Sequence, residues 1–200
     1  MNKKRFIRTI SAVSLATLLG VGLTACSNNS EKSDQSQSSK QSTNIKQKAN
    51  QAKDRIKTEQ IKVDQNEAIN KFHDKFNDKK IKEIDLVNKN NQYVYEIEGF
   101  DATHEYKMTI NATNGKIINS HSEKLELDEH IQKAFNFDKI INRSEATKIA
   151  ENEVKNSTAK EWKLDSDNGK VVWEVEVTNG TKDYNVTIDA ETKKVISVDQ

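Results

Sequence analysis

The stretch Val171–Ile188, VVWEVEVTNGTKDYNVTI, decides the fold of this chain. Its first half alternates apolar and polar side chains with the period of two that is typical of a β-strand with one buried face. Asn179–Gly180 then favours a two-residue type I′ turn, in which both central residues have positive φ. The return strand alternates again, which predicts a β-hairpin with an inward face made of Val171, Trp173, Val175, Val177, Tyr184, Val186 and Ile188.

This hairpin pattern occurs twice. The related stretch YVYEIEGFDATHEYKMTI, at Tyr93–Ile110, lies 78 residues earlier. Around it, Glu67–Ser120 aligns with Glu145–Val198 without a gap, and 16 of 54 positions are identical. Two copies are too few for a stacked repeat array. Duplication of one domain is the simpler interpretation.

A helix start opens each copy. Asp64 precedes Glu67 by three positions, and Asn142 precedes Glu145 in the same way. An Asx side chain at the N-cap accepts a hydrogen bond from the first helical turn, and a glutamate three residues later completes a capping box. Apolar residues then follow at helical spacing. They are Ala68, Ile69, Phe72 and Phe76 in the first copy and Ala146, Ile149, Ala150 and Val154 in the second.

Shorter strand patterns complete each copy. In the second, residues 161–165 lead into the hairpin, and Asp189–Lys193 turns the chain into a last strand at Lys194–Val198. We therefore predict an α+β fold with two tandem modules, each one helix packed on a four-stranded antiparallel sheet. The predicted modules span residues 61–120 and 141–200.

Residues 121–140 join the two predicted modules. A free linker would be polar, whereas this segment holds five large apolar residues. We predict a short helix and connector that packs the modules together through Leu125, Leu127, Ile131, Phe135 and Phe137.

Composition and charge narrow the classes of function. Hydrophobic residues make up 34% of the chain and charged residues 32%, and proline is absent, so small modules with thin cores are expected. The formal charge of +1 includes four basic residues and no acid in the first 26 positions. From residue 61 onward the charge is −6. This sign argues against nucleic-acid binding, which needs a basic face.

The N-terminal leader has the layout of a bacterial lipoprotein signal. A basic start precedes an apolar run from Thr9 to Gly22, which is shorter than the roughly 20 residues that span a bilayer. The next four residues resemble a lipobox, Leu23, Thr24, Ala25 and Cys26. We predict that residues 1–25 are removed and that diacylglycerol alkylates the Cys26 thiol. With two or more acyl chains the anchor is stable, on the outer face of the cytoplasmic membrane.

Residues 26–60 follow as a tether rich in Ser, Gln, Lys and Asn. Such a segment buries too little apolar surface to offset its ordering entropy, so we predict disorder, with a frayed helix from Ala49 to Ile61. The r.m.s. reach of a flexible tether of this length is about 30–35 Å. The Lys-, Asn- and Ile-rich, proline-free composition is typical of a Gram-positive bacterium.

The order of these elements and their motifs resembles the PepSY domain. The best matching residues are Trp173–Val175, Tyr184–Ala190 and Thr192–Val195, and Asn111–Lys116 matches more loosely in the first copy. The resemblance implies binding or regulation of a peptidase outside the cell, because PepSY domains resemble part of the propeptide of thermolysin-like metallopeptidases. Lys193 departs from the pattern, since a turn glycine is usual there.

The sequence shows no catalytic constellation and predicts no cofactor and no metal site. Its four histidines, His73, His104, His121 and His130, lack the spacing of metal ligands. Tyrosines and tryptophans share phase with aliphatic neighbours and are expected in the core or at its edge. Two glutamate pairs lie on one strand face each, and Lys107 is available across the hairpin from the first pair. We interpret them as a solvated outer face and a candidate partner surface, made of Glu96, Glu98, Glu174 and Glu176.

The sequence therefore favours a membrane-anchored extracellular binding module over an enzyme. Its expected partner is a secreted or cell-wall peptidase, which would add a strand to an exposed sheet edge. The alternative is a structural or sensory envelope protein that binds a wall polymer or another membrane protein.

Overall fold

The computed structural model describes residues 48, 50, 57–125 and 133–200. The predicted leader and lipobox, most of the tether, and the connector residues 126–132 with His130 lie outside the described residues. Asn50, Lys57 and Thr58, which fall within the predicted frayed helix, are helical. No described helix is long and apolar enough to cross a membrane.

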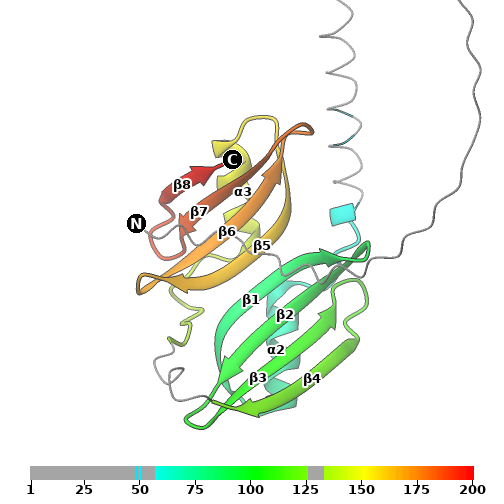
Figure 1. Cartoon of the computed structure of the whole chain (residues 1–200), viewed down its shortest axis with the longest axis vertical. Coiled ribbons are helices and arrows are strands. Elements are labelled where there is room, and N and C mark those ends of the chain that lie inside the picture. The colour runs from blue at the N-terminus through cyan, green and yellow to red at the C-terminus, as the bar shows by residue number, and fades with distance from the viewer. Residues whose placement is uncertain (1–47, 49, 51–56, 126–132) are drawn as a thin grey trace, which may run out of the picture. The chain divides into compact units, whose positions relative to one another are not determined.

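Each module consists of a helix and four antiparallel strands (Figure 1), as the sequence predicts. The first module contains α2 (Gln65–Phe76), β1 (Lys80–Lys89), β2 (Gln92–Phe100), β3 (His104–Asn111) and β4 (Ile117–Lys124). The second contains α3 (Arg143–Glu153), β5 (Thr158–Asp167), β6 (Lys170–Thr178), β7 (Asp183–Asp189) and β8 (Val195–Asp199).

The two sheets join into one. The strand order is β4-β3-β2-β1-β5-β6-β7-β8, and β1 pairs with β5 in the antiparallel direction. Asp85 lies opposite Lys163 at the centre of this junction. The two residues are 78 positions apart and so equivalent in the repeat, which gives the junction an approximate twofold symmetry. The sequence pattern predicts two separate sheets. The junction closes two of their four edges against each other.

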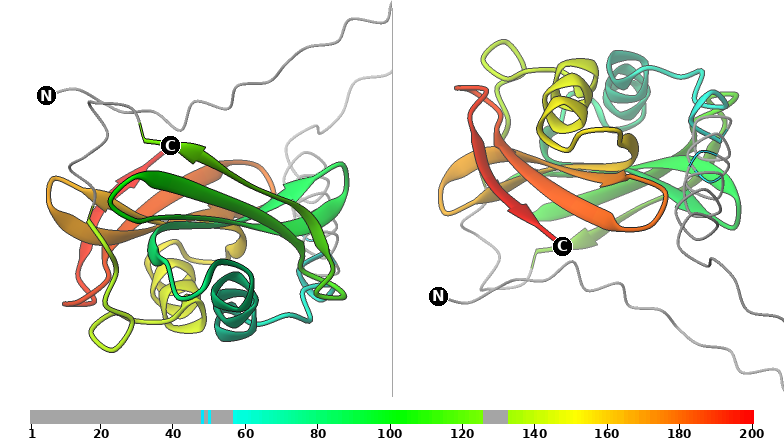
Figure 2. Two further views of the ribbon diagram at one scale, coloured as in Figure 1. Left: turned by 90° about the horizontal axis from the view of Figure 1, so that it is seen from below. Right: turned by 90° about the horizontal axis from the view of Figure 1, so that it is seen from above.

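Both α2 and α3 lie on the same side of this sheet, and no described helix covers the opposite side, which we call the outer face (Figure 2). The predicted caps position the helices. An Asp64 carboxylate oxygen accepts a hydrogen bond of 2.8 Å from the Glu67 N–H. The Asn142 side chain accepts one of 3.0 Å from the Glu145 N–H. The prediction of both helix starts is confirmed.

The core lies between the helices and the sheet, and it is tied in the same way in both modules. Tyr95 donates its hydroxyl to the Val63 carbonyl oxygen at 3.1 Å. At the equivalent position Trp173 donates its indole N–H to the Ile141 carbonyl oxygen at 2.9 Å. The aromatic residues assigned to the core or its edge are found there, since Tyr93, Tyr95, Trp162 and Trp173 are buried and Tyr106 and Tyr184 pack against the core.

Large and small residues have changed places between the two cores. Phe72 of α2 packs directly on Gly99 of β2 in the first module. The equivalent residues in the second module are Ala150 and Val177, and both are buried. The second module also has Trp162 where the first has Ile84. Each core is therefore filled by a different set of residues on the same backbone plan.

The predicted type I′ turn at Asn179–Gly180 is wrong. Asn179 does not have positive φ, and the loop between β6 and β7 contains four residues, because Thr178 pairs with Asp183. The Asn179 side chain closes this loop by accepting backbone hydrogen bonds from Thr181 at 3.1 Å and Lys182 at 3.0 Å. An Asx turn thus replaces the predicted type I′ turn.

Two-residue turns with positive φ at both central positions lie elsewhere. They join β1 to β2 at Asn90–Asn91 and β5 to β6 at Asn168–Gly169. The two pairs are equivalent in the repeat, so both copies place their tight turn at the same hairpin.

The connector, as far as it is described, touches both modules, since Lys133 Nζ donates to the Gly169 carbonyl oxygen of the second module at 2.5 Å. The Phe135 N–H donates to the Ile81 carbonyl oxygen at 2.9 Å. Phe135 and Phe137 are partly buried against the core, with their ring centroids 6.0 Å apart.

Lys193 occupies the left-handed region with φ of +65°, and Gly115 has φ of +72° at the equivalent position. A side chain is unfavourable in that region. We predict that Lys193→Gly raises the free energy of unfolding by about 0.5–1 kcal/mol. The ion pair lost with it, from Lys193 Nζ to Glu145 Oε1 at 3.1 Å, is exposed and contributes little. Urea unfolding measures the change.

Gly115→Ala is the matched control for this prediction. It introduces a side chain into the same backbone conformation and places Cβ 2.9 Å from Lys71 Cε. It should lower stability, whereas an unchanged or lowered stability of Lys193→Gly would contradict the account of this turn.

Candidate functional site

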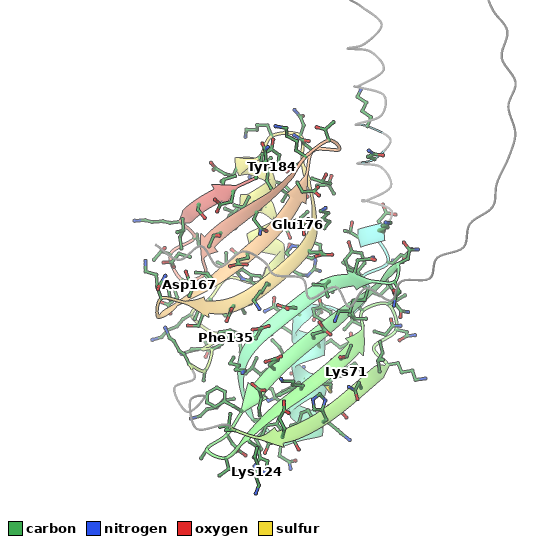
Figure 3. All side chains as sticks on the ribbon, in the orientation of Figure 1. Lys71, Lys124, Phe135, Asp167, Glu176 and Tyr184 are labelled. Atoms are coloured by element: carbon green, nitrogen blue, oxygen red, sulfur yellow. The ribbon has the colours of Figure 1, made fainter. Side chains whose placement is uncertain are left out.

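The outer face of the sheet carries the four glutamates that the sequence singles out. Glu96 and Glu98 alternate along β2 with the buried core residues Tyr95 and Ile97. Glu174 and Glu176 alternate along β6 in the same way, and Glu176 is labelled in Figure 3. The structure therefore places all four on the outer face. Because β1 pairs with β5, this face is continuous across both modules.

A lysine neutralises one glutamate of each pair. Lys82 Nζ lies 3.5 Å from Glu98 and also contacts Glu105. At the equivalent position, Lys160 Nζ lies 2.9 Å from Glu176. Sequence analysis anticipated only Lys107, whose Nζ is 3.9 Å from Glu98. It missed the other two lysines because the register shifts beside each of them, between Ile81 and Glu83 and between Ala159 and Glu161. The extra residue disturbs the alternation that assigns side chains to faces.

The remaining glutamates belong to an acidic group at the junction of the modules. Lys163 stands in this group, with its Nζ 2.6 Å from Glu83 and 3.7 Å from both Asp85 and Asp165. Glu96 is paired with a different lysine, Lys89, at 2.5 Å. We call this group the junction cluster, and its members are Glu83, Asp85, Glu96, Lys163, Asp165 and Glu174.

Carboxylates outnumber lysines in the junction cluster, and the pKa of its central residue reflects this. Burial raises the pKa of Asp85 from 3.8 to about 8, and repulsion from Glu83, Glu96 and Asp165 acts in the same direction against the opposing effect of Lys163. Burial also raises the pKa of Glu174. Burial lowers the pKa of Lys163, but the surrounding carboxylates outweigh it, and the net shift is upward. Protons are therefore retained here well above the ordinary range of carboxyl groups.

The histidines do not converge. His73 lies on α2, His104 at the start of β3 and His121 on β4. Among the residues that the structure describes, no group of three or more His, Cys, Asp or Glu side chains is placed to hold a metal ion.

A small cleft of about 240 Å³ opens where the two helix N-termini meet. Gln65 and Arg143, which are equivalent in the repeat, face each other there, and the Arg143 N–H donates to Gln65 Oε1 at 2.9 Å. The caps Asp64 and Asn142 line the same cleft. These side chains already accept hydrogen bonds from backbone N–H groups of the first helical turns. We therefore interpret the cleft as part of the contact between the modules and not as a ligand site.

β4 and β8 stand at the two ends of the sheet, and no described strand pairs with their outer edges. In β4 the Leu125 N–H donates to the Thr103 carbonyl oxygen at 3.0 Å. Hydrogen-bonded pairs alternate along an antiparallel ladder, so the next pairs join Glu123 to Glu105 and His121 to Lys107. The backbone groups of the residues between them therefore point away from the sheet, at Ser120, Ser122 and Lys124.

The two free edges differ in length. From Asn119 to Lys124, β4 pairs with β3 in a regular register. In β8 the regular register covers only Ser197–Asp199, because a shift separates it from Val195. By the same alternation, Val198 is the residue of this short segment whose backbone groups point outward. β4 has the equivalent register shift between Ile117 and Asn119, so the two edges differ in the length of the regular segment. A shorter edge offers fewer outward backbone groups to a further strand, so β4 is the better acceptor.

Comparisons with known proteins agree with this architecture. The sequence pattern of the PepSY family, described as "Peptidase propeptide and YPEB domain", matches residues 62–121 and 140–199. The chain is also similar to the crystal structure of a "putative lipoprotein" from Clostridium difficile 630, with 28% sequence identity and a TM-score of 0.62. That similarity covers 70% of this chain and 93% of the other. No curated protein matches the chain.

Proposed function

Because this chain belongs to the PepSY family and carries two copies of its domain, we propose that it is a membrane-anchored extracellular protein that binds and restrains a secreted or cell-wall peptidase. It acts as a binding module and not as an enzyme. The family match carries this proposal, since the family description names the propeptide of peptidases.

The N-terminal sequence supports an anchor on the outer face of the cytoplasmic membrane. Cys26 is the only cysteine of the chain and stands at the end of the lipobox-like Leu23–Ala25. The similar protein from Clostridium difficile carries the name lipoprotein. With acyl chains on Cys26, the tether holds the modules within a few tens of ångströms of the bilayer, about 30–35 Å by its r.m.s. length.

The edge of β4 is the docking site in this proposal. Its regular segment offers the unpaired backbone groups of Ser120, Ser122 and Lys124 to an extended strand of the peptidase. Main-chain pairing supplies affinity with little demand on side-chain identity. The side chains on this edge are small or flexible, and nearly all of β4 is exposed, so a strand can approach without displacing them.

The acidic outer face adds selectivity to this site. Glu98 lies two strands from β4, because β2 pairs with β3 and β3 pairs with β4. Glu98 is itself paired with Lys82 and Lys107, so basic side chains of a peptidase docked at β4 are expected to reach across to the carboxylates of the junction cluster. The candidate partner surface consists of Glu96, Glu98, Glu174 and Glu176. Glu174 and Glu176 lie on β6, far from β4 in the strand order, so only a larger partner docked at β4 would contact them.

The experiment is a titration of secreted metallopeptidases of the same organism with soluble residues 27–200. We expect saturable inhibition of at least one peptidase and its capture in a pull-down. Absence of both would contradict the proposal. Retention by purified wall material together with indifference to peptidases would instead favour the structural or sensory role.

Proline variants test the docking edge. Ser122→Pro removes an outward N–H of β4 without removing a bond to β3, because proline is tolerated where the N–H faces solvent. We expect it to weaken inhibition at least tenfold. Val198→Pro makes the same change on β8 and should leave inhibition intact. Equal effects of the two variants would contradict docking at β4.

A further inference from the structure

The β4 edge is complementary to a second copy of itself. We propose that two chains associate reversibly by antiparallel pairing of their β4 strands about Ser122. The pairing itself follows from the strand geometry alone. Its consequence, that paired chains hide the docking edge, rests on the proposed function.

The backbone fixes the register of this pairing. The outward groups of β4 belong to Ser120, Ser122 and Lys124, and antiparallel strands pair through residues whose groups face each other. A twofold axis at Ser122 therefore joins Ser122 to its counterpart, and Ser120 of each chain to Lys124 of the other. All three outward positions are then satisfied on both chains.

The side chains fit the same register. His121 of each chain lies opposite Glu123 of the other on the outer face. The twofold axis therefore produces two equivalent His–Glu pairs. His121 and Glu123 are exposed, and Glu123 also lies 3.1 Å from Lys107 in its own chain. A ring N–H of His121 can donate to the free carboxylate oxygen of Glu123. Cross-strand pairs of this kind are favourable, whereas like charges in the same place are not.

The chain already closes two of its edges in this manner. β1 and β5 pair antiparallel about equivalent positions, with Asp85 and Lys163 facing each other at the centre. Pairing of two β4 strands would repeat that arrangement between chains. β8 does not offer the same surface, because its regular segment holds only Ser197, Val198 and Asp199.

The expected strength is low. A contact limited to one strand edge falls below the roughly 1,000 Å² that stable interfaces bury. Association is therefore weak in dilute solution and is favoured where tethers concentrate the chains on one membrane surface.

Disulfide trapping in membranes tests the pairing with the full, anchored chain. Ser122→Cys places two thiols opposite each other on the twofold axis, whereas in Gln200→Cys, its repeat equivalent beside β8, the thiols do not meet. Under mild copper-catalysed oxidation we expect the first variant to yield several-fold more dimer than the second. The wild type, whose single cysteine is the predicted lipid attachment position Cys26, should yield none. Equal yields from both variants, or none from Ser122→Cys, would overturn the proposal.

A charge exchange tests the register. In the Ser122→Cys background, Glu123→Lys places a lysine opposite His121 and should lower the dimer yield about threefold to tenfold. Adding His121→Glu restores opposite charges and should recover the yield. The same dimer yield in Ser122→Cys alone and in the two variants with changed charges would contradict this register. The readout involves no peptidase, so it is independent of the inhibition experiment.

Discussion

Phe72→Ala is expected to lower the free energy of unfolding by about 3–5 kcal/mol, because it leaves a cavity where a fully buried ring was. Gly99→Val should also destabilise the chain, by about 3 kcal/mol. A Cβ at position 99 lies 2.5 Å from Phe72 Cζ and 2.7 Å from the Lys80 carbonyl oxygen.

The double variant tests whether the two substitutions compensate each other in the core. The second module holds alanine and valine at these two positions, so its backbone plan accommodates the exchanged pair. We expect Phe72→Ala with Gly99→Val to be about 2 kcal/mol more stable than the sum of the single changes implies. Urea unfolding of residues 27–200 measures all three variants. Strict additivity would show that the two cores are not alternative packings of one plan.

Asp85→Asn is expected to stabilise the chain in alkaline solution and to leave it nearly unchanged near pH 4. The pKa of Asp85 rises from 3.8 to about 8 in the folded chain because of burial and neighbouring carboxylates. The folded chain therefore holds a proton that the unfolded chain releases, and stability falls as the pH rises from about 4 to 8. Asparagine removes this loss, which for a pKa that moves from 3.8 to about 8 reaches at most about 5 kcal/mol at pH 8.

The measurement is the difference in unfolding free energy between wild type and Asp85→Asn across this pH range. Other carboxyl groups titrate in both proteins and largely cancel. Lys163→Met is the opposing control, since it removes the cation that partly compensates the junction cluster. It should destabilise the chain, and more at pH 8 than at pH 5. A difference between wild type and Asp85→Asn that shrinks as the pH rises would contradict the account of the junction.

The sequence was sufficient to predict those features that local patterns determine. Asp64 and Asn142 are each followed three positions later by a glutamate. This pattern predicts both helix starts, because a helix cap depends only on residues that are neighbours in the sequence. The alternation in Val171–Ile188 predicts which residues face the core, since it follows from strand geometry. The constant offset of 78 residues predicts the tandem modules.

Features that depend on contacts between distant segments were not predictable. The pairing of β1 with β5 rests on three residue pairs from different modules, and an edge strand looks the same in sequence whether it is free or paired. Lys82 and Lys160 were missed because a single extra residue in each strand reverses the alternation. The turn at Asn179 was wrong because an Asx side chain competes with the tight turn that the same dipeptide favours.

Two consequences for the candidate site follow from these misses. Closure of the β1 and β5 edges leaves β4 and β8 as the outer strands of the sheet in the part of the chain that the structure describes. The lysines restrict the excess negative charge of the outer face to the junction cluster. The docking proposal is therefore more specific than the sequence allowed, because it names one edge and the residues whose backbone groups face outward.

Amide hydrogen exchange of residues 27–200, with and without an inhibited peptidase, tests the central claim most directly. Strand addition at β4 predicts that the amides of Ser120, Ser122 and Lys124 exchange much more slowly in the complex, while that of Val198 on β8 is unchanged. Protection confined to β8 or to the helices, or no protection in a complex that forms, would contradict it.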